Sequence, residues 1–261
     1  IINVIFIFLK GMILMRASGI LMHISSLPNS YGIGKMGKEA YAFADFLKAS
    51  KQKYWQILPV SPTSYGDSPY QSFSVYAGNP YFIDFESLEE QGYLKSSDYK
   101  NINWGDDPLC TDYSILYENV FKVLKIAYKN FKKNPEKEFE FFLQKNENWI
   151  ENYGLFMALK TENGGKPWSE WPEPLKMFEA DAIKKAKKKY SDEINYWCFI
   201  QYKYFEQWEK LKGYVNSLGI EIIGDIPIYV AYDSVDVWTC PQYFLLDKNK
   251  TPIDVAGCPP D

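Results

Sequence analysis

A strand–helix–strand pattern near the N-terminus constrains the fold of this chain more than any other feature. Apolar runs at residues 19–28 and 53–63 are each typical of a short buried strand that leads into a loop. Residues 38–50 lie between them and place apolar side chains at helical spacing, at Ala40, Phe43, Ala44 and Leu47. Two strands joined by a helix form a right-handed unit of a parallel sheet. The pattern therefore predicts an α/β fold with parallel strands.

A third strand follows only after a long interval. Residues 220–230 form an apolar run, which Gly224 and Asp225 interrupt. The residues before it are too many for a simple crossover connection, and they carry apolar stripes at helical spacing, as at 149–157 and 194–211. We therefore expect an inserted, mainly helical subdomain between the second and third strands. The stretch 81–85 is the one part of this interval that is typical of a strand.

Charge and composition exclude several classes of partner. The chain has a net charge of −4 and one dense basic run, at 184–190, so we expect no binding to nucleic acid. The apolar run at 1–9 is too short to span a bilayer, and we expect no membrane partner. The four cysteines have no paired spacing, which predicts a reduced, cytoplasmic protein without a zinc site. Met12 and Met15 are candidate start positions, so residues 1–14 are interpreted as an extension outside the native fold.

A loop at residues 63–80 combines aromatic rings with turn residues and small polar side chains. Sugars bind to such surfaces, because pyranose C–H faces lie on rings while hydroxyl groups bond to carboxylates and amides. The residues of the loop that fit this chemistry are Tyr65, Asp67, Ser68, Tyr70 and Gln71. The alternative is a compact surface loop packed by its own rings. We call residues 63–80 the aromatic loop.

Asp225 and His23 are two further candidates for a binding site. Asp225 lies within the apolar run of the third strand, where a charge is costly unless it is paired or used. In β/α barrels the carboxyl ends of the strands carry the active site, although a structural aspartate bonded to loop amides is the alternative. His23 is the only histidine and follows the first strand. It is either a ligand donor or a hydrogen-bonded core residue.

A glycine pattern ahead of the first helix offers a different interpretation. Gly32, Gly34 and Gly37 match the G-x-G-x-x-G spacing of dinucleotide-binding turns. The pattern does not follow its strand directly, and Pro59 and Val60 stand where an acidic ribose-binding residue belongs. A nucleotide-binding α/β protein is therefore kept only as an alternative, and the glycines are interpreted as shaping a turn.

Several motifs, in the same order, resemble one known family. The chain is similar to the amylomaltases, the 4-α-glucanotransferases of glycoside hydrolase family 77, from about Ser18 to its last residue. The matching segments are SSLPNSYGIGKMG (25–37), YWQILPVSPT (54–63), SYGDSPYQSFSVYAGNPY (64–81), GDIPIYVAYDSVDVW (224–238) and VAGCPPD (255–261). The region 90–190 matches only loosely.

The resemblance implies an α/β fold of the (β/α)8 barrel type with a largely helical inserted subdomain. It implies transfer of α-1,4-glucan segments between maltodextrins, with α-1,4-glucans as partners and with no cofactor or metal. Tyr70, Ser68 and Asp225 correspond to sugar-contacting residues, and Tyr65 to an accessory glucan contact. Asp225 in this family holds the substrate and is not the nucleophile.

The resemblance also divides the chain and raises doubt about its activity. It implies a first part of the barrel at 15–63, the aromatic loop and inserted subdomain at 64–218, and the third strand with its following loop at 219–261. A retaining transfer needs two carboxyl groups about 5–5.5 Å apart, and in this family they follow later strands. We therefore expect an incomplete barrel, a nucleophile and acid/base beyond residue 261, an inactive chain, and an exposed sheet edge with apolar surface. A non-catalytic glucan-binding protein is the alternative.

Overall fold

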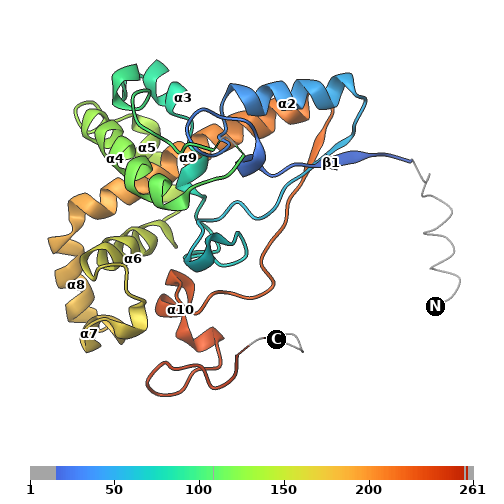
Figure 1. Ribbon diagram of the computed structural model, residues 1–261. Coiled ribbons are helices and arrows are strands. Elements are labelled where there is room, and N and C mark those ends of the chain that lie inside the picture. Colours follow the sequence, from blue (N-terminus) through green and yellow to red (C-terminus); the bar gives the residue numbers. More distant parts are fainter. Residues whose placement is uncertain (1–15, 108, 256, 258–261) are drawn as a thin grey trace, which may run out of the picture.

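A small parallel sheet organises one end of the molecule (Figure 1). The computed structural model describes residues 16–107, 109–255 and 257, so the extension at 1–14 lies outside the described residues. Three parallel strands are ordered as in the sequence: β1 (Gly19–Leu21), β2 (Tyr54–Gln56) and β3 (Glu221–Ile223). Trp55 stands in register between Ile20 and Ile222. The α/β class and the parallel pairing are thus confirmed.

Two helices lie side by side over the sheet (Figure 1). They are α2 (Lys38–Ala49) and α9 (Ser191–Ser217), and α9 also packs against β3. The predicted stripe of α2 is buried at Ala40, Ala44 and Leu47, and Phe43 lies edge-on against Trp55 with 5.0 Å between ring centroids. On the opposite face of the sheet, Leu21 and Ile223 are 54% and 43% exposed. One face of the sheet is therefore covered and the other is open.

The other end of the molecule is a helical layer around the first part of α9. It contains α4 (Tyr113–Phe131), α5 (Lys137–Lys145), α6 (Ile150–Glu162) and α8 (Ala180–Lys189), each of which contacts α9. The short helices α3 (Phe85–Glu90), α7 (Glu173–Lys176) and α10 (Val235–Thr239) complete the α-helices of the described residues. The long helix α9 thus runs from the helical layer to the sheet. No helix in the described part of the chain is long and apolar enough to cross a bilayer.

Two stretches of the sequence prediction were wrong in detail. Residues 81–85 form no strand: Asn79 caps the 3-10 helix η3 (Pro80–Phe82), and Asp84 caps α3 by accepting the Ser87 N–H. Their side chains satisfy the free N–H groups of helix starts, which favours helix over strand at this point. The third strand is also shorter than 220–230, because its last ladder bond joins Ile57 N–H to the Ile223 carbonyl.

Two buried glutamines of α9 hold the end of the aromatic loop and the start of α3. Gln201 accepts the Gly78 N–H at 2.7 Å and donates to the Gly78 carbonyl at 3.0 Å. Gln207 does the same with Asp84, at 2.7 and 3.1 Å. Each amide therefore satisfies both backbone groups of one residue, as a neighbouring strand would. We call these contacts the glutamine clamps.

The glycine pattern at 32–37 is packed against protein, which contradicts the nucleotide interpretation. A Cβ at Gly34 would lie 1.8 Å from the Ile24 carbonyl oxygen, and one at Gly37 would lie 2.5 Å from an Asp84 oxygen. The Asp84 carboxylate thus faces the start of α2, where a phosphate would need to bind. The glycines allow close packing of a turn, as the sequence also indicated.

Candidate functional site

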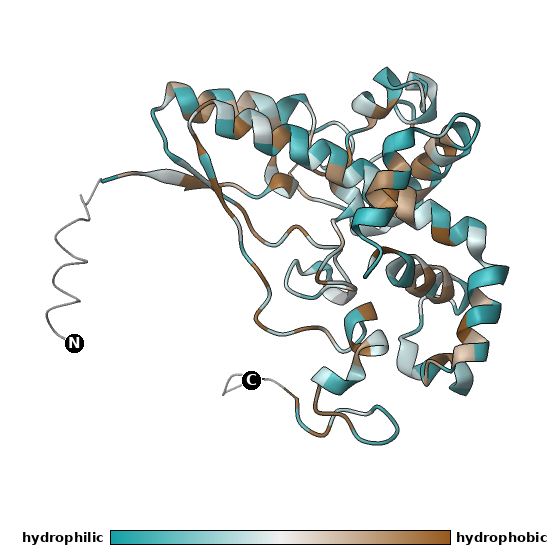
Figure 2. Ribbon diagram, turned by 180° about the vertical axis from the view of Figure 1, so that it is seen from behind, coloured by the Kyte–Doolittle hydropathy of each residue, from teal (hydrophilic) through white to brown (hydrophobic). Residues whose placement is uncertain are grey.

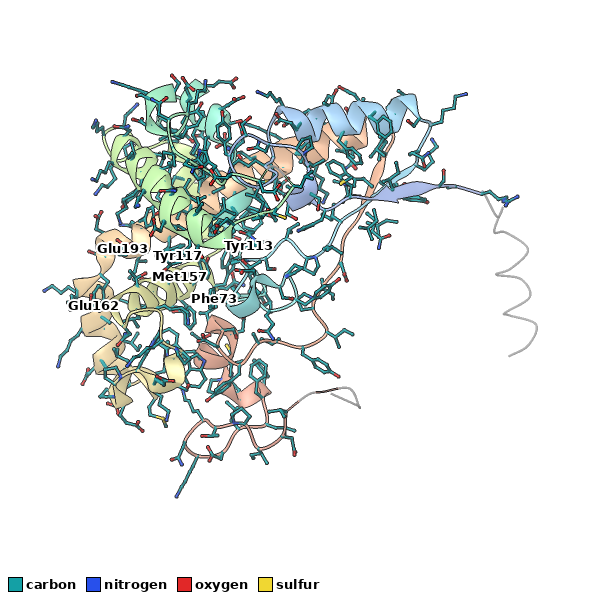
Figure 3. The ribbon with its side chains drawn as sticks, viewed as in Figure 1. Phe73, Tyr113, Tyr117, Met157, Glu162 and Glu193 are labelled. Carbon is teal, nitrogen blue, oxygen red and sulfur yellow. The ribbon has the colours of Figure 1, made fainter. Side chains whose placement is uncertain are left out.

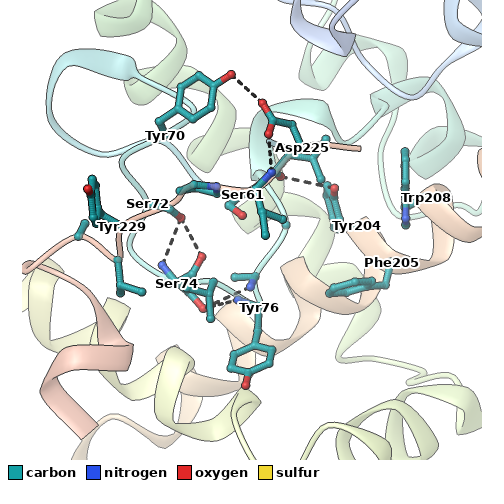
Figure 4. Close-up of a pocket in the computed structure, with 18 residues that line it drawn as sticks. Ser61, Tyr70, Ser72, Ser74, Tyr76, Tyr204, Phe205, Trp208, Asp225 and Tyr229 are labelled. Carbon is teal, nitrogen blue, oxygen red and sulfur yellow. Dashed lines mark hydrogen bonds between the residues drawn. The ribbon is translucent and has the colours of Figure 1, made fainter. Parts of the chain in front are cut away.

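A cleft of about 370 Å³ lies beyond the carboxyl ends of the strands (Figure 4). One wall comes from residues 60–61, before the aromatic loop, and from Tyr70, Ser72 and residues 74–78 within it. The second comes from residues 225–227 and 229–231, which follow β3, and the floor includes Tyr204, Phe205 and Trp208 of α9. Side chains from three separate parts of the sequence therefore meet in this cleft.

Tyr70 and Asp225 join the two walls of the cleft. The Tyr70 hydroxyl donates to Asp225 Oδ2 at 2.7 Å, while Asp225 Oδ1 accepts the N–H of Ile226 at 2.8 Å (Figure 4). This hydrogen bond to a carboxylate raises the pKa of Tyr70. Tyr70 is 45% exposed and Asp225 is also exposed. The pair thus offers a ring face and a carboxylate to a molecule in the cleft.

The aromatic loop presents Tyr70 by folding into a tight turn. Its 3-10 helix η2 (Tyr65–Asp67) has positive φ at Gly66 and at Asp67, a conformation that glycine and aspartate tolerate. The Tyr70 N–H donates to Ser68 Oγ at 3.3 Å, and the Ser64 N–H donates to the Gln71 carbonyl at 3.1 Å. Ser68 and Gln71 therefore shape the turn that carries Tyr70.

The remaining rings and serines of the loop divide between core and surface. Ser72 and Ser74 are buried, and Ser74 Oγ accepts the N–H groups of Tyr76 and Ala77. Phe73, labelled in Figure 3, packs against the core. Its ring centroid lies 6.3 Å from that of Phe156. Tyr76 is 56% exposed and stacks on Trp149 of the helical layer. The loop is thus packed partly by its own residues and still leaves Tyr70 free on one side.

His23 lies away from the cleft, at a smaller cavity of about 110 Å³ that Asp67 also lines. It is 7% exposed, its Nδ1 accepts the Leu58 N–H at 3.2 Å, and its ring meets Phe82 edge-on. Burial lowers the pKa of His23 to about 4. Of the two interpretations open from the sequence, these contacts favour the hydrogen-bonded core residue.

Comparison with known proteins identifies the family. The family model for 4-alpha-glucanotransferase, glycoside hydrolase family 77, matches residues 22–261. The chain belongs to this family. A 4-alpha-glucanotransferase of Clostridium butyricum is 49% identical over 92% of this chain, and that of Thermus thermophilus is 46% identical over 94%. The fold matches an amylomaltase from Streptococcus agalactiae in complex with acarbose, with a TM-score of 0.92 and 48% identity over 94% of this chain.

This family 77 chain spans about half the length of the curated relatives it matches. It covers 50% of the Clostridium butyricum protein and 49% of the Thermus thermophilus protein. It likewise covers 50% of the Streptococcus agalactiae chain. The likeness to these proteins therefore concerns one half of each of them.

The structure separates the candidate residues of this family 77 chain into three groups. Tyr70 and Asp225 meet in the cleft, whereas His23 and Asp67 line the smaller cavity. Ser68 and Gln71 form the turn and do not line the cleft. Tyr65 begins η2, and its side chain lies outside what the structure describes.

Five aromatic residues of the cleft were not among the candidates from the sequence: Tyr76, Tyr204, Phe205, Trp208 and Tyr229. Phe205 and Trp208 belong to a stripe that was interpreted as core, Tyr204 is their neighbour in the sequence, and Tyr229 lies in the apolar run of the third strand. Side chains of an extended segment alternate between its two faces. In the strand predicted over 220–230, this alternation places Tyr229 on the same face as Asp225, and that spacing was the signal that could have found it, although the strand ends at Ile223.

Proposed function

We propose that the chain forms the glucan-binding part of a retaining 4-α-glucanotransferase, which transfers α-1,4-glucan segments between maltodextrins. The hydrogen bond between Tyr70 and Asp225 across the cleft carries this proposal. The exposed ring of Tyr70 offers a flat face to a pyranose, and the Asp225 carboxylate can accept hydrogen bonds from sugar hydroxyl groups. The acarbose bound to the Streptococcus agalactiae amylomaltase supports a carbohydrate ligand. Ser68 and Gln71 support the turn that carries Tyr70, and Tyr65 and Asp67 are further candidate contacts in the same loop. His23 lies away from the cleft and is not part of the proposed contact surface.

We infer that Asp225 holds the sugar rather than attacking it. A retaining transfer needs a nucleophile and an acid/base about 5–5.5 Å apart. Asp225 is the only carboxylate among the described residues that line the cleft. This observation favours a second candidate function, a glucan-binding protein that does not transfer. The chain by itself then binds maltodextrins without turnover.

We also infer the barrel type and the compartment. The sheet is interpreted as the first strands of a (β/α)8 barrel, because neighbouring parallel strands follow the chain order with helices over one face. The open face of the sheet is the side that faces the interior in such a barrel. A cytoplasmic location is supported by the free thiols of Cys110, Cys198 and Cys240, since reducing compartments keep thiols free.

Calorimetric titration of the 261-residue chain with maltoheptaose tests the binding proposal. Tyr70→Phe removes one hydroxyl, and Asp225→Asn removes the negative charge that strengthens hydrogen bonds from sugar hydroxyl groups. Because hydrogen bonds to charged groups contribute about 1.5–3 kcal/mol, each variant is expected to bind roughly tenfold or more weakly. Tyr243→Phe and Asp181→Asn are exposed controls that do not line the cleft, and their affinity stays unchanged. Undiminished affinity in both cleft variants contradicts the site.

Incubation with maltotriose separates the two candidate functions. Glucose together with longer maltodextrins shows transfer by the chain itself, whereas affinity without new products shows binding alone. We expect binding alone, because the described lining holds a single carboxylate.

A further inference from the structure

A buried ion pair connects the helical layer to the segment that follows β3. Lys160 of α6 is 6% exposed, and its Nζ lies 2.5 Å from Asp233 Oδ2. Asp233 Oδ1 also accepts the N–H of Trp168 at 3.2 Å. The Trp168 indole in turn donates to the Tyr232 carbonyl at 2.7 Å. Residues 232–233, downstream of Asp225, are therefore fixed to the helical layer by charge and by hydrogen bonds.

The same ammonium group also contacts the aromatic loop. Lys160 Nζ lies 4.7 Å from the centroid of the Phe73 ring, which is within the range of cation–π attraction. Phe73 is close in sequence to Tyr70, so this contact holds the part of the loop that presents the Tyr70 ring. Lys160 thus touches both segments that supply the walls of the cleft, although it does not line the cleft itself.

Two backbone contacts close the connection between these segments beside Lys160. The Val235 N–H donates to the Phe73 carbonyl at 2.9 Å. The Val75 N–H donates to Asp236 Oδ2 at 3.0 Å. With Phe73 and Asp233 both held by one ammonium group, the two walls have little freedom to slide past each other.

We propose that Lys160 is a positioning residue, whose contacts with Asp233 and Phe73 align Tyr70 with Asp225 across the cleft. Breaking a buried ion pair on one side leaves an uncompensated charge, and the surrounding segments move to hydrate it. Loss of Lys160 is therefore expected to lengthen or break the hydrogen bond between Tyr70 and Asp225.

The hydrogen bond between Tyr70 and Asp225 can be measured without any glucan, through the pKa of the tyrosine. A difluorotyrosine placed at position 70 of the 261-residue chain reports its own ionisation by 19F NMR. Asp225 is the charged group that raises the pKa of Tyr70, so the label at 70 is expected to titrate at higher pH than the same label in the Asp225→Asn chain. Lys160→Met is expected to abolish this difference, and Lys160→Arg, which keeps the charge, to restore part of it.

A second buried lysine provides the matched control. Lys203 of α9 is fully buried and ion-paired to Glu136 and Glu206, away from the cleft lining. Lys203→Met therefore loses stability for the same reason as Lys160→Met. It is expected to leave the titration of the label at Tyr70 unchanged. A folded Lys160→Met chain with an unchanged label at Tyr70 overturns the proposal, as does an equal change in Lys203→Met.

Two further variants keep the test decisive if Lys160→Met does not fold. Lys160→Met combined with Asp233→Asn removes both charges, and removing a whole buried pair is often close to neutral for stability. Phe73→Leu leaves all charges in place and weakens the contact from the loop side. Each is expected to lower the pKa of the label at Tyr70, and no lowering in the folded variants refutes the alignment role.

Affinity for maltoheptaose gives a second reading, which rests on the proposed function. Lys160→Met is expected to bind roughly tenfold more weakly, and adding Tyr70→Phe to it is expected to cost little more, because both changes remove one interaction. Additive losses contradict the coupling of Lys160 to Tyr70. If no variant and no unmodified chain binds glucan, the proposed function fails while the 19F result still decides the role of Lys160.

Discussion

The neutral, buried imidazole of His23 makes the stability of this chain depend on pH. Its pKa in the folded chain is lowered to about 4 by burial, against 6.5 for an unperturbed histidine. Between these values the unfolded chain binds a proton that the folded chain does not. Stability is therefore expected to fall as pH decreases from 6.5 to about 4, by up to roughly 3 kcal/mol.

Urea unfolding at pH 7 and at pH 4.5 checks this expectation for His23. Carboxylates also titrate in this range, so the reference is His23→Gln, whose amide oxygen can accept the Leu58 N–H without titrating. The loss of stability on acidification should be smaller in the variant. As the sequence has one histidine, its NMR signal follows the titration directly, and a midpoint near 6.5 would refute the lowered pKa.

Individual site residues differed in how far the sequence could place them. Tyr70 and Asp225 were predicted as sugar contacts from the family resemblance, and the structure brings them within 2.7 Å although they are 155 residues apart. His23 left two interpretations open, because a sequence pattern does not reveal that its Nδ1 accepts a hydrogen bond from the Leu58 N–H. Lys160 gave no signal, since it follows the stripe at 149–157 as one charged residue of a helix and its partner Asp233 is distant in the sequence.

At the scale of elements, two glycines near or within α9 predict opposite effects of the same substitution. Gly213 lies in the helix, and a Cβ there meets nothing within 4 Å. Gly213→Ala is expected to stabilise the chain by about 0.5–1 kcal/mol, because alanine loses less backbone entropy. Gly78→Ala is expected to destabilise it by about 2 kcal/mol or more, because the new Cβ lies 1.9 Å from a ring carbon of the buried Tyr204.

Thermal unfolding of the two alanine variants measures these effects side by side. The pair is internally controlled, as each adds the same methyl group. A destabilised Gly213→Ala chain would show that the end of α9 is held by something other than helix propensity. A Gly78→Ala chain as stable as the unmodified protein would show that Tyr204 can move, which its complete packing argues against.

The elements were predictable where one period governs many residues. The stripe of α2 and the long helix α9 follow from apolar spacing, and the strands from short apolar runs. The structure of residues 81–85 was not predictable in this way, because two capping side chains, Asn79 and Asp84, decide it. The glutamine clamps were equally hidden, since buried glutamines in a helix do not indicate which distant backbone they satisfy.

At the scale of the whole molecule, apolar side chains remain uncovered along the segment after β3. Ile226, Ile228 and Val230 are 79%, 89% and 37% exposed, and Figure 2 shows the hydrophobic ribbon that descends from the sheet. Leu21 and Ile223 extend this surface over the open face of the sheet. The apolar surface expected from the sequence is thus present. Surfaces of this kind drive association of proteins.

We expect the chain to self-associate through this segment at micromolar concentrations. Ile226→Lys combined with Ile228→Lys places two like charges on it and is expected to shift sedimentation velocity profiles towards the monomer. Leu109→Lys is the control, because Leu109 is 92% exposed but lies apart from this surface. A chain that sediments as a monomer without substitution contradicts the expectation.

The glutamine clamps also set where this chain can gain or lose residues in evolution. The number of residues from Gly78 to Asp84 equals the number from Gln201 to Gln207. Both pairs of hydrogen bonds therefore form only when neither segment gains or loses a residue. An insertion between Gly78 and Asp84 would release one buried amide from its partner, which costs about 1–3 kcal/mol. Exposed connections such as residues 105–107 carry no such constraint. Length differences among relatives are therefore expected to collect there and to spare the clamped interval.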